Sequence, residues 1–75
     1  MKYAEDLAKD YDFQSGIEYF DYIIKSLVNG NRQQVRSLFN QMKKSDKETF
    51  LIEHLNVNIG YHKSVLNICI GELCK

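Results

Sequence analysis

The sequence predicts a small all-α protein, a four- or five-helix bundle built around a central helical hairpin. Apolar residues recur at intervals of three and four along almost the whole chain, and nothing reads as a ladder of strands. Proline, the strongest helix breaker, is absent. The 75 residues are expected to form one domain, residues 1–75. A chain of this size buries only about 60% of the surface that it exposes when unfolded, so a partner subunit is a common supplement.

The first two helices are predicted over residues 3–11 and 16–28. The segment from Asp12 to Ser15 separates them, and Ser15 or Gly16 can begin the second. In residues 16–28 the apolar positions cover most of the circumference, and the clearly polar ones are Glu18, Asp21 and Lys25. A helix of this kind is central and packs on two sides.

The centre of the chain predicts a helical hairpin. Asn29-Gly30 can take a positive φ and end the second helix, and Asn31, with Gln34 three positions later, is expected to cap the third. This third helix is predicted over residues 32–43, with its apolar face at Val35, Leu38, Phe39 and Met42.

The last third of the chain predicts two further helices. Ser45 and Glu48 have the spacing of a capping box, which would begin a fourth helix at Ser45. The final helix is expected over residues 62–74. Between them, residues 56–62 are read as a short connector, and one long bent helix is the alternative.

Two resemblances concern the hairpin. Gly30, Val35, Leu38, Phe39 and Met42 have the spacing of a pentatricopeptide repeat, so residues 19–42 resemble one degenerate unit of that family. This resemblance implies a helical hairpin. It implies no RNA-reading residues, because such arrays need about three or more units. More loosely, NGNRQQVRSLFNQMKKSDKETFL resembles short accessory proteins of phages and other mobile elements.

Composition narrows the class of protein. The chain is 44% hydrophobic and has no net charge, which argues against a dedicated DNA-coating protein. The first ten residues lack the apolar core of a signal peptide, and no apolar run reaches the length of a membrane span. We therefore expect a complete, cytoplasmic protein without a membrane segment, in which Cys69 and Cys74 stay reduced.

No catalytic or metal-binding pattern is recognised. The order His54, His62, Cys69, Cys74 has intervals of eight, seven and five residues, longer than the ligand spacing of most zinc modules. Nucleophile, P-loop and dinucleotide motifs are absent. We expect no enzyme activity, no cofactor and no metal, and we read the histidines as surface residues.

Charge is polarised along the chain and gives two alternatives. Residues 1–22 hold six acidic and two basic side chains, and residues 23–47 hold six basic and one acidic. The second set could bind nucleic acid through Arg32, Arg36, Lys43, Lys44 and Lys47, with the first three on one helical edge. Alternatively, the two sets neutralise each other across the hairpin, with Asp21 level with Arg36 and Glu18 near Asn40 and Lys43.

Aromatic residues are concentrated near the amino terminus. Six of the nine aromatic side chains lie within residues 1–22, beside the six acids. Tyrosine is enriched at protein interfaces. The leading hypothesis is a protein-binding module, a homodimer or a regulator or inhibitor from a phage or mobile element that binds a host or viral protein. Its contact surface is predicted at Tyr11, Phe13, Tyr19 and Tyr22.

Overall fold

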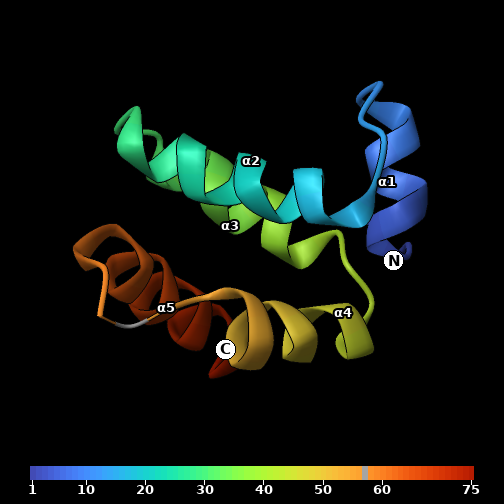
Figure 1. The fold of residues 1–75 in the computed structure, drawn as a ribbon. Coiled ribbons are helices and arrows are strands. Elements are labelled where there is room, and N and C mark those ends of the chain that lie inside the picture. The colour runs from blue at the N-terminus through green and yellow to red at the C-terminus, as the bar shows by residue number, and fades with distance from the viewer. Residues whose placement is uncertain (57) are drawn as a thin grey trace.

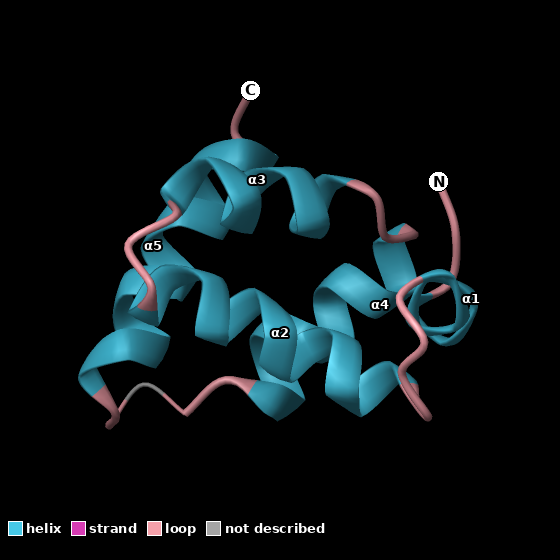
Figure 2. Ribbon diagram, turned by 90° about the horizontal axis from the view of Figure 1, so that it is seen from above, coloured by secondary structure: helices cyan, strands magenta, loops and turns pink. Residues whose placement is uncertain are grey.

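The computed structural model describes residues 1–56 and 58–75 and confirms the all-α fold class. Its elements are α1 (Ala4–Asp10), α2 (Gly16–Val28), α3 (Arg32–Asn40), α4 (Lys44–Thr49), a π-helical turn η1 (Phe50–His54) and α5 (Gly60–Leu73). Helices α2 and α3 form one layer, and α4, η1 and α5 form the other (Figure 1). Helix α1 stands across one end of the bundle, upright in Figure 1 and seen end-on in Figure 2.

The predicted hairpin is confirmed. Gly30 has a φ of 80°, and the Asn31 side chain accepts a hydrogen bond from the Gln34 amide at 3.0 Å. Two hydrogen bonds join the helices, one between Tyr22 and Gln34 nearer the turn and one between Tyr19 and Leu38 farther from it. Helices α2 and α3 are therefore antiparallel neighbours.

Tyr19 donates a hydrogen bond to a backbone carbonyl near the end of α3. Its side chain is fully buried, and its hydroxyl donates to the Leu38 carbonyl at 2.6 Å. The last carbonyls of a helix lack amide partners within it, and the Met42 amide donates to Phe39 instead. The phenol of Tyr19 thus satisfies a backbone group that burial would otherwise leave unpaired.

The third helix ends earlier than predicted because the amino-terminal segment pairs with its last expected turn. The Lys2 amide donates to the Gln41 carbonyl, and the Lys43 amide donates to the Lys2 carbonyl, both at 2.9 Å. These bonds form an isolated parallel bridge between Lys2 and Met42. Residues 41–43 consequently leave the helix, so α3 ends at Asn40.

The predicted capping box of the fourth helix is wrong. Lys43 is the N-cap of α4, and Ser45 lies inside the helix, where its carbonyl accepts from the Thr49 hydroxyl. The carboxylate of Asp46, in the first turn of α4, instead caps a different helix: it accepts a hydrogen bond from the Ala4 amide at 2.7 Å. An acid of α4 therefore satisfies an amide at the start of α1.

A π-helical turn and a connector follow α4. The Leu55 amide donates to the Phe50 carbonyl, five residues earlier, and Leu55 then takes extended dihedral angles. Helix α5 begins at Gly60, two residues before the predicted start. The chain leaves the helix between η1 and α5, which favours the connector over one bent helix; Val57, within the predicted connector, lies outside the described residues.

The core lies between the two layers. Its fully buried large side chains come from α2, α3, η1 and α5 and from the segment after α3: Tyr19, Ile23, Val35, Phe39, Met42, Phe50, Val65 and Cys69. Helix α5 contributes one face, while Ile70 and Leu73 on another face are exposed. Both cysteines are free thiols, Cys69 buried and Cys74 exposed.

Replacing Tyr19 by Phe is expected to destabilise the protein by about 1–2 kcal/mol, because the buried Leu38 carbonyl loses its donor. Urea unfolding monitored by circular dichroism measures the change. Tyr61→Phe is the matched control, since Tyr61 is 57% exposed and its substitution is expected to change stability by less than about 0.5 kcal/mol. Equal stability of the two variants would contradict the role assigned to Tyr19.

The two cysteines are expected to differ in reactivity towards a thiol reagent at pH 8. Burial, with the nearby Glu72 charge, raises the pKa of the Cys69 thiol to about 12, and the thiolate is the reactive form. The native protein should therefore react once, at Cys74, and Cys74→Ser should react only after unfolding. Rapid labelling of Cys69 in the native protein would show that this part of the core is open.

Candidate protein-interaction surface

Three aromatic side chains meet where α1 turns into α2. Tyr11 follows α1, Phe13 lies in the loop and Tyr22 is on α2, and we call these three residues the corner cluster. Their ring centroids are 5.4 to 5.9 Å apart, with Tyr11 and Phe13 stacked and Phe13 edge-on to Tyr22. Tyr11 is 39% exposed, and the other two are half-buried. The structure thus brings three of the four predicted contact residues together at the surface.

Tyr19 is a correction to the predicted contact surface. It packs against Tyr11 with 5.9 Å between ring centroids, but it has no exposed surface. Burial raises the pKa of its phenol, and its hydroxyl is used by the Leu38 carbonyl. Tyr19 packs against the buried side of the corner cluster and is not available to a partner.

The loop between α1 and α2 positions the corner cluster through backbone hydrogen bonds. Asp12 has a φ of 61°, in the left-handed region that often ends helices, and Asp tolerates it better than most residues. The Phe13 amide can then donate back to the Ala8 carbonyl at 2.8 Å. After the reversal, the Glu18 carboxylate accepts from the Gln14 amide at 2.6 Å. Together these bonds turn the chain so that Phe13 reaches Tyr22.

An open hollow of about 320 Å³ adjoins the corner cluster. It is lined by Phe13, Glu18, Asp21, Tyr22 and Lys25. The four residues from α2 lie at intervals of three, one and three, so they share one helical face. This spacing is the one feature of the sequence that indicates the hollow, which is not among the predicted sites. The lining combines two aromatic walls with two carboxylates and one ammonium group.

The basic residues of the alternative interface do not form one free edge. Lys43 lies beyond α3, with its ammonium 4.2 Å from the Tyr3 ring centroid, and Lys47 lies 5.4 Å from that of Phe39. The predicted alignment of Lys43 with the arginines on one helix is therefore wrong. Arg36 is partly buried. The pKa of Glu72 is lowered chiefly by its hydrogen bonds with Lys75 and Asn40, and the charge of Arg36 adds a smaller contribution. Arg32 and Lys44 are the two of the five that are exposed.

The charged residues of α2 and α3 do not pair with each other as predicted. Asp21 pairs with His54 of η1 at 2.9 Å, and Asn40 donates to Glu72 of α5 at 2.7 Å. Glu18 is used by the Gln14 amide. Within residues 1–56 and 58–75, no ion pair joins Asp21 to Arg36. Asp21 of α2 and Asn40 of α3 therefore contact residues of the second layer. The sequence pattern did not indicate which residues of the two layers would meet.

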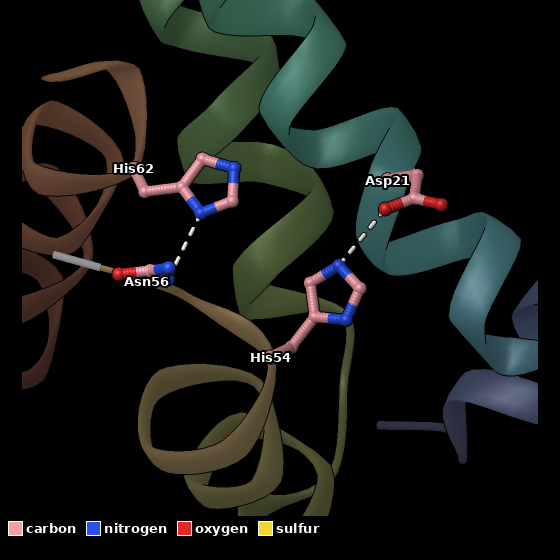
Figure 3. A network of polar contacts seen from close by, with 4 residues as sticks. All are labelled: Asp21, His54, Asn56 and His62. Atoms are coloured by element: carbon pink, nitrogen blue, oxygen red, sulfur yellow. Dashed lines mark hydrogen bonds and ion pairs between the residues drawn. The ribbon is translucent and has the colours of Figure 1, made fainter. Parts of the chain in front are cut away.

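The histidines occupy defined positions in a polar network (Figure 3). The His54 ring lies against Phe20 and Phe50, and its Nε2 is the atom that meets Asp21. Nδ1 of His62 accepts a hydrogen bond from the Asn56 amide at 2.9 Å. Both side chains are half-buried at the surface, each held by one of these polar contacts. The described residues contain no group of three or more His, Cys, Asp or Glu placed to hold a metal ion.

Two further findings concern the class of protein. Among the helices of the described residues, none is both long enough and apolar enough to cross a membrane. Comparisons with protein-family models, curated proteins and solved structures found no match to this chain.

Proposed function

We propose that this chain is a non-enzymatic protein-binding module whose contact surface is the corner cluster and the hollow beside it. The observation that carries the proposal is that the exposed Tyr11 meets the half-buried Phe13 and Tyr22 at the surface of a fold that has an aromatic core elsewhere. Clustered aromatic side chains beside a hollow are typical of the centres of protein interfaces. The exposed acids Asp12, Glu18 and Asp21 lie around this surface and favour a partner with basic and apolar side chains.

The size and composition of the chain support regulation or inhibition by binding. The proposed context is a phage or other mobile element, with a host or viral protein as the partner. A second copy of the chain is the other candidate partner, because helix α5 exposes Ile70 and Leu73 outside its buried face. An apolar face of this kind can be covered by self-association.

The corner cluster is tested by affinity capture from the host cell, followed by measurement of the captured protein's affinity. Tyr11→Ala should weaken that affinity at least tenfold, as the loss of an exposed aromatic anchor does at interface centres. Tyr61→Ala is the matched control, since Tyr61 is also exposed but lies on α5. Circular dichroism checks that both variants are folded.

The outcome separates the candidate partners. If a second copy binds through the corner cluster, light scattering will show a dimer that Tyr11→Ala dissociates and Tyr61→Ala does not. A dimer that Tyr11→Ala leaves intact would instead support self-association through the exposed Ile70 and Leu73 of α5. If both variants retain full affinity for a captured protein, or lose it equally, the corner cluster is not the contact surface.

Nucleic-acid binding is the alternative function, and Arg32 and Lys44 are its exposed candidates. We expect titration with labelled DNA and RNA at 50 and 200 mM salt to show no salt-sensitive binding at micromolar protein. The reason is that Lys43 and Lys47 lie over aromatic rings of the same chain and Arg36 is partly buried beside Glu72. Tight binding that weakens steeply with salt and is lost in an Arg32→Ala, Lys44→Ala double variant would instead support the alternative.

A further inference from the structure

The hollow beside the corner cluster combines aromatic walls with an excess of negative charge. Phe13 and Tyr22 form the walls, and their ring planes meet at 69°. Glu18 and Asp21 contribute two carboxylates, against the single ammonium group of Lys25. The volume of about 320 Å³ lies at the lower end of the range for ligand pockets. The hollow therefore has room for one long side chain, and its charge favours a cation.

Each carboxylate of the hollow uses one oxygen within the chain and keeps a second. Oε2 of Glu18 accepts from the Gln14 amide at 2.6 Å, and Oδ1 of Asp21 lies 2.9 Å from Nε2 of His54 (Figure 3). Within residues 1–56 and 58–75, Oε1 of Glu18 and Oδ2 of Asp21 have no hydrogen-bond or ion-pair partner. In the same part of the chain, Lys25 lies within ion-pair distance of neither acid. Two charged oxygens thus remain for donors from another molecule.

The aromatic walls are held in position by polar contacts of their own. The Tyr22 hydroxyl accepts a hydrogen bond from the Gln34 side chain, and the Phe13 amide donates to the Ala8 carbonyl. With these groups engaged, the two residues offer ring surface to a ligand. A site whose walls are already positioned loses less conformational freedom on binding, so even a small ligand can bind measurably.

Arginine suits this combination of groups better than lysine. Its guanidinium is planar, stacks on aromatic rings and presents several N–H donors in a fixed fork that can meet carboxylate oxygens. Aromatic faces also attract a cation placed over them. The ammonium group of lysine is compact and strongly hydrated, and the hollow already holds one, from Lys25.

We propose that the hollow binds one arginine side chain of the protein partner. The guanidinium lies against Phe13 and Tyr22, and its N–H groups donate to Glu18 and Asp21. This inference rests on the proposed function, because it names the side chain with which the partner enters the contact surface. Tyr11 does not line the hollow, so the arginine contact and the contact at Tyr11 can be tested separately.

Titration of the full chain with N-acetyl-arginine amide at low salt, followed by NMR, tests the hollow directly. Saturable binding in the millimolar range should shift the ring resonances of Phe13 and Tyr22, because one side chain supplies few contacts. N-acetyl-citrulline amide, which is similar in shape but uncharged, should show no saturable binding. N-acetyl-lysine amide should bind more weakly by about threefold or more. Equal binding of either control, or shifts confined to other surfaces, would overturn the proposal.

Two variants of the hollow should change the affinity for N-acetyl-arginine amide in opposite directions. Glu18→Gln keeps an oxygen for the Gln14 amide but removes a charge, and it should weaken binding about two- to fivefold, the range for an exposed ion pair. Lys25→Gln removes a repelling charge and should strengthen binding. Glu48→Gln is the matched control, since Glu48 is exposed on α4 and does not line the hollow.

Circular dichroism checks that the three variants are folded. If Glu18→Gln and Glu48→Gln weaken binding equally, the effect is one of overall charge and the arginine site is wrong. The same holds if Glu18→Gln and Lys25→Gln change the affinity in the same direction.

The captured partner separates failure of this inference from failure of the proposed function. If Tyr11→Ala loses the partner while Glu18→Gln and Lys25→Gln bind it like the wild type, the corner cluster is the contact surface and the arginine site is overturned. If Glu18→Gln weakens and Lys25→Gln strengthens partner binding while Tyr11→Ala has no effect, the arginine site is supported and the contact at Tyr11 is wrong.

Discussion

The bundle depends on the burial of α2 against more than one neighbour. Tyr19 and Ile23 of this helix have no exposed surface, and Phe20 is 6% exposed. Helix α2 contacts α1, α3 and α5, so three of the other helices use it as a packing surface. An isolated helix of its 13 residues would be marginal in water. Its stability therefore comes from those neighbours, and their arrangement follows from the faces that α2 presents.

The parts of the fold that could be predicted are those determined by neighbouring residues. The turn at Gly30 and the cap at Asn31 require only a positive φ and an amide acceptor within three positions, and both were predicted. The end of α3 and the start of α4 could not be predicted in the same way. They depend on Lys2 and Ala4, which reach residues 41–46 only after the chain has folded. Ser45 and Glu48 have the spacing of a capping box, but α4 begins one residue earlier, at Lys44, beside the contact with the amino-terminal segment.

The candidate site was predictable to the level of a region. An aromatic concentration in residues 1–22 indicated the corner, but apolar positions around most of α2 gave no means of deciding which tyrosine points inward. Tyr19 and Tyr22 are only three residues apart, yet one caps α3 from the core and the other lines the hollow. The polar contact of His54 was missed for a related reason. A π-helical turn adds a residue to the repeat, and it orients His54 in a way that a regular helical wheel does not represent.

The amino-terminal pairing also constrains the order in which the chain can fold during synthesis. The hydrogen bond between the Ala4 amide and Asp46 joins residues 42 positions apart. The hairpin of α2 and α3 needs only contacts within residues 16–40 and can form as soon as they have left the ribosome. Helix α1 packs on α2, but the Ala4 amide gains its acceptor only once α4 has been translated. Helix α4 has no buried residue of its own to stabilise it earlier. The two ends of this contact are therefore expected to become ordered together, late, on a hairpin that is already present.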